Sequence, residues 1–529
     1  MKDYLMNTYN RKKVSFTRGD GVYLWDSEGK KYLDALCGLA VTGLGHSHPE
    51  ISKVIYNQSQ TLIHTSNAFI IEQQKSLAKR LCQLTGMSTS FFCNSGAEAV
   101  EASIKIARKY GNDKNISNPK IIVMDNSFHG RTMATLSATG NKKAHDGFYP
   151  LMEGLLRVPF NNTSAISELS KNDKSIVAVL LEPIQGEGGI IIPDNDYLDN
   201  LRKICDENNW LLILDEVQSG FCRTGKWFGY QHSSILPDIV TVAKALGNGV
   251  PIGACLANEK ASKILMPGSH GSTFGGNFLS TSVGLKVLDI MREMNLCSNV
   301  RVIGDYFEQQ LHETFDSNFQ VEEIRCKGLM IGIQLKKDSV HLAEEALDLG
   351  LVINITQSNI IRLLPPLILN KEKVDSVLHD MRIITAETAF VVRTFFFIIF
   401  GWSVFLGSLL NIKVVLLGLV ILTIIYVVRG IILFLFRGKN IALELFLAPR
   451  GLVTILLFFA IPEGLSLGKE FQGVLLFVVL ISCVIMAWSL ISYKKRVLKI
   501  HDDGGGDGEI DPDSEFTKIT PCENEQKDG

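Results

Sequence analysis

Short, mainly apolar runs alternate with amphipathic stretches between residues 90 and 290, and this alternation constrains the fold more than any other feature. Helical patterns occupy the stretches, notably Ala97–Tyr110 and Tyr197–Asn208. Because each run is four or five residues long and bounded by polar or turn residues, we interpret the runs as buried strands. Alternating strands and helices predict an α/β fold with a mostly parallel sheet covered on both faces. The four predicted strands are Ile121–Met124, Val177–Leu181, Leu211–Leu214 and Ile239–Val242.

Polar residues just after such strands are candidate site residues, because ligands of these sheets bind beyond the carboxyl ends of the strands. Asn94–Ala99 leads into a predicted helix, whose N-terminal N–H groups could bind a phosphate. An ordinary Ser95 N-cap would explain the same residues. Ser127–Arg131 offers an aromatic ring that could stack on a planar cofactor and an arginine that could bind a carboxylate, although either residue alone is a weak signal.

Two charged residues end apolar runs. Asp215 closes the run that starts at Leu211, where a buried carboxylate needs a cationic partner. That partner could be the protonated pyridine nitrogen of a cofactor, or a basic side chain in a purely structural salt bridge. Lys244 follows the run Ile239–Val242 and precedes a glycine-rich turn. Lysine is rarely buried unless it is paired or chemically used, so we predict that Lys244 forms an imine with an aldehyde cofactor.

Ten motifs stand in order from Arg18 to Pro366. They are Arg18-Gly-Asp-Gly-Val-Tyr-Leu-Trp-Asp, Gly43-Leu-Gly-His-Ser-His-Pro, Ser95-Gly-Ala-Glu-Ala, Ser127-Phe-His-Gly-Arg-Thr, Glu182-Pro-Ile-Gln-Gly-Glu-Gly-Gly, Asp215-Glu-Val-Gln, Ala243-Lys-Ala-Leu-Gly, Gly271-Ser-Thr-Phe-Gly-Gly-Asn, Lys327-Gly-Leu-Met-Ile-Gly and Arg362-Leu-Leu-Pro-Pro. Together they resemble the class III aminotransferases of fold type I, specifically the acetylornithine aminotransferase branch. The resemblance implies an aminotransferase over residues 1–388, with a large domain at about 60–290 and a smaller α+β domain from 1–59 and 291–388.

The same resemblance implies pyridoxal 5′-phosphate as cofactor. Lys244 would hold the cofactor covalently and shuttle a proton, and Asp215 would pair with its pyridinium nitrogen. The other implied cofactor contacts are the backbone of Gly96 and Ala97 to the phosphate, Phe128 stacked on the ring, Val217 and Gln218 against the ring and its phenolic oxygen, and Thr273 reaching the phosphate from the neighbouring subunit of a homodimer.

The resemblance also implies how substrates bind. Arg131 would bind the substrate α-carboxylate, with Ser272 adding a polar contact. Glu187 would neutralise Arg362 while the amino donor binds, and would then swing away so that the second carboxylate of 2-oxoglutarate can use the arginine. Leu39 stands where ornithine aminotransferases have a tyrosine and favours an acylated α-amine. We therefore predict transfer of the δ-amino group of N2-acetyl-L-ornithine to 2-oxoglutarate, with ornithine, succinylornithine and succinyl-diaminopimelate as alternative donors.

Several residues depart from the family pattern without removing a catalytic group. Ala97 replaces a Thr that is usual in the family, Cys222 and Asn248 replace glycines, and Phe278 replaces a Pro. The ten cysteines show no metal-type spacing, so we predict reduced thiols rather than a disulfide framework, and no metal site. A net charge of −2 gives no reason to expect nucleic-acid binding.

The composition changes sharply near residue 388. Four mostly apolar stretches follow, each long enough to cross a bilayer core of ~30 Å: Phe390–Leu410, Val414–Phe436, Ile441–Ile461 and Gly473–Tyr493. We predict transmembrane helices within 389–496 that insert in the cytoplasmic membrane, with the aminotransferase in the cytoplasm because lysines and arginines gather on its side. Residues 497–529 are acidic and glycine-rich and predict a disordered tail.

The segment Leu447–Ile455, which follows Glu444, resembles the C-terminal part of monovalent cation/proton antiporters. An aminotransferase followed by such a segment could be a natural fusion or an artificial joining of two reading frames. The alternative functional class is therefore a membrane cation/proton transport protein with a regulatory soluble domain. An intact set of Lys244, Asp215, Arg131 and Arg362 favours the enzyme, because a regulatory domain need not keep all four.

Overall fold

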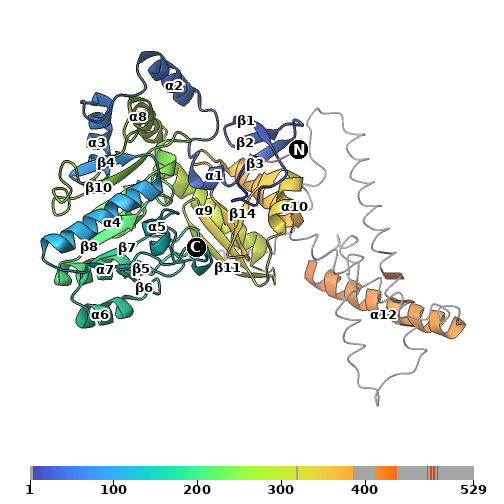
Figure 1. Ribbon diagram of the computed structural model, residues 1–529. Coiled ribbons are helices and arrows are strands. Elements are labelled where there is room, and N and C mark those ends of the chain that lie inside the picture. The colour runs from blue at the N-terminus through green and yellow to red at the C-terminus, as the bar shows by residue number, and fades with distance from the viewer. Residues whose placement is uncertain are drawn as a thin grey trace, which may run out of the picture. The chain divides into compact units, whose positions relative to one another are not determined.

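The computed structural model describes residues 4–316, 318, 320–384 and 411–437, and six residues between 474 and 485. The chain divides into two compact units, Met1–Ala386 and Glu387–Gly529. The first unit contains the helices and strands of the predicted α/β fold (Figure 1). The second contains one described long helix.

The central sheet of the first unit has seven strands. Its order is β4 (Thr89–Cys93), β10 (Gly253–Ala257), β9 (Ile239–Val242), β8 (Leu211–Asp215), β7 (Ile176–Leu181), β5 (Lys120–Met124) and β6 (Leu155–Val158). The strands from β9 to β6 pair in parallel, and β10 runs antiparallel to both of its neighbours. The four predicted strands are β5, β7, β8 and β9, so the prediction of a mostly parallel sheet is confirmed.

Strand β7 shows why the runs are apolar throughout. Ala178 and Leu180 belong to the hydrophobic cluster formed with α4 (Gly96–Asp113), whereas Val179 and Leu181 belong to the cluster that includes α7. Successive side chains of a strand point to opposite faces, and helices cover both faces here, so each position must be apolar. Further helices of the first unit are α2 (Pro49–Thr61), α3 (Glu72–Thr85), α5 (Met133–Ala138), α6 (Thr163–Asn172), α7 (Tyr197–Asn208), α8 (Phe278–Glu293), α9 (Leu296–Phe315) and α10 (Leu342–Leu349), and residues 371–384 are also helical.

The first unit also contains two four-stranded sheets, one of which combines its two ends. One has the order β1 (Phe16–Asp20), β2 (Tyr23–Asp26), β3 (Lys31–Asp34) and β13 (Leu351–Val352); the other has the order β11 (Val321–Lys327), β12 (Met330–Leu335), β15 (Ile360–Leu363) and β14 (Asn354–Thr356). Strand β13 pairs in parallel with β3, which joins the N-terminal strands to residues beyond 350. The predicted boundaries between a large and a small domain stay a prediction.

The short turn α1 (Cys37–Ala40) has a left-handed backbone. All four of its residues have positive φ, from 42° at Cys37 to 67° at Leu39. Asp34 closes the start of the turn, because its Oδ1 accepts hydrogen bonds from the backbone N–H of Leu36 and of Cys37 at 2.9 and 2.8 Å. Only one of the four residues, Gly38, adopts this conformation without steric cost.

Two cysteines form a disulfide, which corrects the expectation of reduced thiols. Cys222 and Cys297 are bonded, with Cα atoms 4.6 Å apart, although 75 residues separate them along the chain. Cys222 has a φ of 65°, the left-handed conformation that explains why glycine is usual at this position in the family pattern. The other described cysteines are free: Cys37, Cys82, Cys93, Cys205, Cys255 and Cys326.

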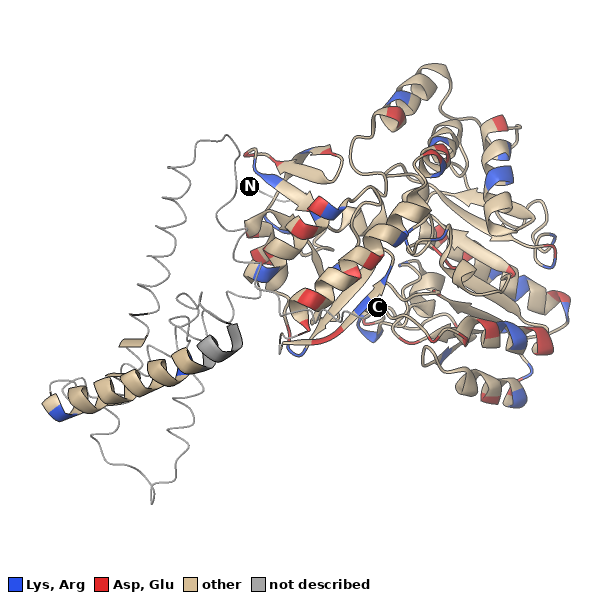
Figure 2. Cartoon of the chain, turned by 180° about the vertical axis from the view of Figure 1, so that it is seen from behind, with Lys and Arg blue, Asp and Glu red and all other residues tan. Residues whose placement is uncertain are grey.

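The second unit contains α12 (Ile412–Arg437), which includes the predicted span Val414–Phe436. By length and composition it could cross a membrane, and it is the one such helix among the described residues. Figure 2 shows α12 as predominantly uncharged, whereas helices of the first unit carry both signs of charge. The other three predicted spans lie wholly or mostly outside the described residues, and the predicted tail lies outside them entirely.

Candidate active site

A cavity of about 410 Å³ opens at the carboxyl ends of β8 and β9, beside the N-terminus of α4. Parallel strands bring distant parts of the chain to this edge, as expected for an open α/β sheet. Nine of the predicted site residues line the cavity: Gly96, Ala97, Phe128, Arg131, Glu187, Asp215, Val217, Gln218 and Lys244.

Lys244 follows β9 and begins the short η3 turn (Lys244–Leu246) with a φ of 43°. Its Nζ has no hydrogen-bond partner among the described residues. Burial lowers the pKa of Lys244, and the nearby Arg362 cation lowers it further, against the opposing charges of Glu187 and Asp215. A lower pKa increases the neutral fraction of the amine, which is the nucleophilic form.

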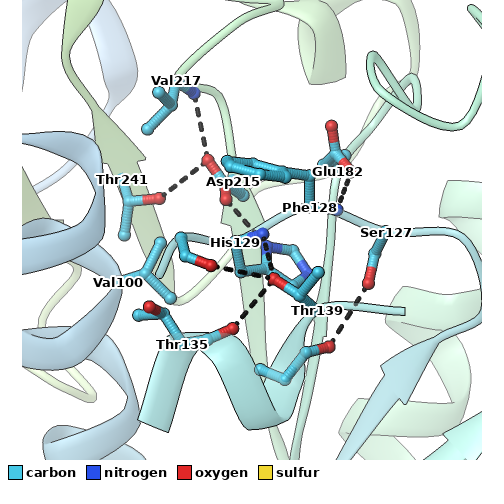
Figure 3. Close-up of polar contacts among 12 residues, drawn as sticks. Val100, Ser127, Phe128, His129, Thr135, Thr139, Glu182, Asp215, Val217 and Thr241 are labelled. Carbon is cyan, nitrogen blue, oxygen red and sulfur yellow. Dashed lines mark hydrogen bonds and ion pairs between the residues drawn. The ribbon is translucent and has the colours of Figure 1, made fainter. Parts of the chain in front are cut away.

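Asp215 at the end of β8 is 4% exposed and is held from three directions (Figure 3). Its Oδ1 accepts hydrogen bonds from the backbone N–H of Val217 at 3.1 Å and from Thr241 Oγ1 at 3.3 Å. Its Oδ2 lies 2.8 Å from Nδ1 of His129. These contacts fix the orientation of the carboxylate at the wall of the cavity.

His129 and Glu182 line the same cavity, and the sequence analysis assigned neither of them a role. Glu182 accepts hydrogen bonds from the backbone N–H of Phe128 at 2.9 Å and of Gly186 at 3.0 Å. Burial raises the pKa of Glu182 to about 7; His129 opposes this rise, and Asp215 adds to it. Both residues stand in the quoted motifs, but the hydrogen bonds that place them join distant residues: His129 and Asp215 are 86 residues apart, and Phe128 and Glu182 are 54 apart.

The N-terminus of α4 has the geometry of an anion site. Ser95 caps the helix, with Oγ accepting a hydrogen bond from the backbone N–H of Glu98 at 3.2 Å. The N–H groups of Gly96 and Ala97 lie in the first turn, where a helix offers no internal acceptor. A Cβ atom on Gly96 would lie 2.7 Å from Cγ1 of Val217, so only glycine lets the helix end approach this wall.

Gln218 brings an unsatisfied polar atom to the cavity. Its Oε1 is buried without a hydrogen-bond partner among the described residues. A Cβ atom on Gly186 would lie 2.1 Å from this oxygen, so the glycine makes room for the amide. A buried amide group without a partner is costly, and a polar ligand atom would satisfy it.

These groups fit the predicted cofactor. The cavity combines an amine with a lowered pKa (Lys244), a fixed carboxylate (Asp215), a free helix N-terminus and apolar walls that include Phe128 and Val217. In pyridoxal phosphate, the aldehyde would react with Lys244 and the ring nitrogen would pair with Asp215. The helix N-terminus would bind the phosphate, and the apolar walls would contact the ring.

Glu187 and Arg362 form an ion pair, with Oε1 and Nη1 2.7 Å apart. The arginine side chain is 1% exposed, whereas that of Glu187 is 33% exposed. The guanidinium of Arg131 lies 4.7 Å from the ring centroid of Phe128, so the predicted substrate arginine contacts the predicted stacking ring.

Four predicted site residues do not line the cavity. Arg362 is one of them, although its ion-pair partner Glu187 does line the cavity. Ser272 Oγ accepts a hydrogen bond from Asn94 Nδ2 at 3.2 Å, and Asn94 lines the cavity. Thr273 and Leu39 are exposed, the latter at 36% in the α1 turn, two residues before the lining residue Val41.

Comparison with known proteins gives one family. The model of the family "Aminotransferase class-III" matches residues 5–384. The acetylornithine aminotransferase of Nitrosomonas europaea is 50% identical over 378 residues, which cover 72% of this chain and 96% of that protein. The acetylornithine aminotransferase of Methanocaldococcus jannaschii is 44% identical over 381 residues, which cover 72% and 95%. The antiporter-like segment Leu447–Ile455 lies outside the residues that the family model matches.

Solved structures agree with the fold. The acetylornithine aminotransferase from Elizabethkingia anophelis is 33% identical, with a TM-score of 0.66, and the match covers 73% of this chain and 96% of that one. The ornithine aminotransferase from Toxoplasma gondii ME49 is 29% identical, with a TM-score of 0.71, and the match covers 73% and 93%.

Proposed function

The chain belongs to the class-III aminotransferase family, and from that premise we propose that it is an acetylornithine aminotransferase. It is a pyridoxal-phosphate-dependent transaminase that transfers the δ-amino group of N2-acetyl-L-ornithine to 2-oxoglutarate. The products are N-acetylglutamate 5-semialdehyde and glutamate, in arginine synthesis. The observation that carries the proposal is the single cavity that holds Lys244, Asp215 and Glu187 together with the free N-terminus of α4.

The residues present have the chemistry to hold the cofactor. Gly96 and Ala97 bind the phosphate through backbone N–H groups, Phe128 and Val217 contact the ring, and Asp215 holds a proton on the ring nitrogen. Pyridoxal phosphate, when bound, supplies an electron sink for the substrate carbon that loses its proton. Lys244 Nζ accepts that proton and returns it, a role that its lowered pKa supports.

Two substrates of different charge must use one pocket in turn. Arg131 binds the α-carboxylate of the amino acid, and Ser272 adds a polar contact beside it. Glu187 neutralises Arg362 while the acylated donor is bound, as the ion pair at 2.7 Å allows. The second carboxylate of 2-oxoglutarate then replaces Glu187 at the arginine. The greater exposure of Glu187 supports its being the partner that moves.

A homodimer completes the site in this proposal. Thr273 is exposed and does not line the cavity of its own chain. Large apolar side chains are also exposed at Phe274, next to Thr273, and at Phe69 and Ile70, which follow a residue (Asn67) that donates hydrogen bonds to the carbonyls of Ser272 and Gly275. Thr273 therefore reaches the phosphate of the neighbouring subunit.

Substrate selection is tested by Leu39→Tyr. The wild type is expected to prefer N-acetylornithine over ornithine in kcat/KM by at least tenfold, about 1.4 kcal/mol in transition-state binding. A tyrosine hydroxyl would offer the charged α-amine of ornithine a polar partner, so the variant is expected to raise the relative kcat/KM for ornithine about tenfold.

The matched control is Leu349→Tyr, which places the same side chain at an exposed leucine that ends α10. Succinylornithine and succinyl-diaminopimelate are measured alongside with 2-oxoglutarate as acceptor. A wild type that prefers ornithine, or a succinylated donor, by tenfold contradicts the proposed substrate. An unchanged preference in Leu39→Tyr contradicts the role of Leu39 alone.

For the C-terminal part we propose a membrane anchor rather than a transporter. The supporting observation is α12, which is long and apolar enough to span a bilayer and exposes Leu416, Val420 and Ile424. The full chain is expected to remain in the membrane pellet after alkaline extraction, with the aminotransferase accessible from the cytoplasmic side. Recovery of the intact chain in the supernatant would exclude the anchor. Cation flux into proteoliposomes would instead restore the transport alternative.

A further inference from the structure

The guanidinium of Arg362 has a second partner besides Glu187. Both Nε and Nη2 donate hydrogen bonds to Oδ1 of Asn354, at 3.1 and 2.7 Å. Nη1 alone donates to Glu187 Oε1. Nε and Nη2 thus donate to a neutral amide oxygen, whereas Nη1 donates to a carboxylate that the proposed function requires to leave.

Strand pairing puts Asn354 in this position. Strand β14 runs antiparallel to β15, and Asn354 lies directly opposite Arg362 in the register. Side chains of directly opposed residues lie on the same face of a sheet and are close enough to interact. The contact is therefore set by the hairpin itself and does not depend on Glu187.

The same hairpin also holds the main chain of Glu187. Thr356 Oγ1 donates a hydrogen bond to the carbonyl oxygen of Glu187 at 2.6 Å, and Gln357 Nε2 donates to the same oxygen at 3.1 Å. Thr356 follows Asn354 by two residues and so shares its face of β14. With its carbonyl held, Glu187 can leave the arginine by rotating its side chain.

We propose that Asn354 is a positioning residue that holds Arg362 in place, without neutralising its charge, when Glu187 moves away. The proposal deepens the proposed function and rests on it. A buried guanidinium without an acceptor is costly, and Arg362 is 1% exposed. An amide oxygen supplies the acceptor without cancelling the positive charge that the second carboxylate of 2-oxoglutarate needs. A carboxylate at position 354 would cancel it.

The test is Asn354→Asp, which keeps the shape and adds the charge. The two half-reactions are measured separately in single turnovers of the holoenzyme. The half-reaction with 2-oxoglutarate is expected to lose roughly 10- to 100-fold in kcat/KM, the range for a hydrogen bond to a charged group. The half-reaction with N-acetylornithine, which does not use the free arginine, is expected to change less than threefold.

A binding measurement gives a readout that does not depend on turnover. Calorimetry with glutarate, a dicarboxylate of the same length as 2-oxoglutarate, is expected to show at least tenfold weaker binding to Asn354→Asp than to the wild type. Asn354→Ala serves as a second variant that adds no charge. It is expected to weaken glutarate binding and the 2-oxoglutarate half-reaction about tenfold, because the arginine loses its fixed orientation.

The matched control is Asn359→Asp in the turn of the same hairpin, where Asn359 Nδ2 donates a hydrogen bond to the carbonyl of Leu335 at 2.7 Å. It makes the same chemical change away from Arg362, so it reports a purely structural effect on the hairpin. Equal losses in both half-reactions of the two Asn354 variants, or unchanged glutarate binding, would overturn the proposal. A wild type that does not transaminate N-acetylornithine would sink the proposed function instead, while the glutarate comparison would still test Asn354.

Discussion

Replacement of Lys244 by methionine is expected to abolish transamination while the fold remains intact. Methionine fills a similar volume but has neither a nucleophile nor a proton acceptor. Loss of the proton transfer alone lowers kcat by roughly 10²- to 10⁴-fold, and loss of the covalent cofactor link adds to this. The measurements are single-turnover rates with N-acetylornithine and the absorbance of the bound cofactor, whose band for the lysine-linked form should be missing.

The same variant has an expected effect on stability that needs no cofactor. Because the pKa of Lys244 is lower in the folded chain than in the unfolded one, the unfolded state binds the proton more tightly. The stability of the wild-type apoprotein therefore rises with pH in the window below the ordinary lysine pKa of about 10.4. Lys244→Met removes this contribution, so the variant is expected to melt higher near pH 8 and to lose its advantage towards pH 10.

Lys263→Met is the matched control, since Lys263 is exposed on a turn away from the cavity. It is expected to keep both the absorbance band and the activity. Substantial transamination by Lys244→Met would contradict the assignment of Lys244 as the catalytic lysine. A lower melting temperature of the variant throughout the pH range would contradict the effect of burial on its pKa.

Asp215→Asn is expected to have the second largest effect. The change keeps an oxygen for the hydrogen bonds from Val217 and Thr241 but removes the negative charge that would hold a proton on the ring nitrogen. Removing one partner of a buried charge pair costs about 3–5 kcal/mol. We therefore expect kcat to fall on the order of 10²- to 10³-fold. The cofactor absorbance should also change its dependence on pH.

The control for this variant is another buried aspartate, which directly precedes β9. Asp238 is 3% exposed and pairs with Arg202 at 2.8 Å, away from the cavity. Asp238→Asn is expected to lower the melting temperature and to leave the cofactor spectrum unchanged. If both variants lowered kcat equally, with an unaltered spectrum in each, Asp215 would have a structural role only.

Much of the fold could be predicted because its signals are local. The run Ile239–Val242 and the helix Tyr197–Asn208 have the same bounds in the structure as in the sequence analysis. Burial on both faces makes a strand continuously apolar, and burial on one face gives a helix its periodicity, so each pattern can be read within a few residues.

The contacts that could not be predicted join residues that are far apart in the sequence. His129 faces Asp215 across 86 residues of sequence, and Cys222 bonds Cys297 across 75. Asn354 stands in no recognisable motif, and its role follows only from its place opposite Arg362 in a hairpin. Such contacts are fixed by strand register and packing, which one sequence without an alignment does not reveal.

The left-handed α1 turn has a consequence for how this enzyme could evolve. Three of its residues other than glycine have positive φ, and each conformation of this kind costs about 1–2 kcal/mol. Selection for thermal stability alone would replace them with glycine, yet Leu39 is one of them and is the proposed determinant of the donor. Stability and substrate choice therefore compete at the same position, and a thermostable homologue with glycine there would be expected to discriminate less sharply among donors.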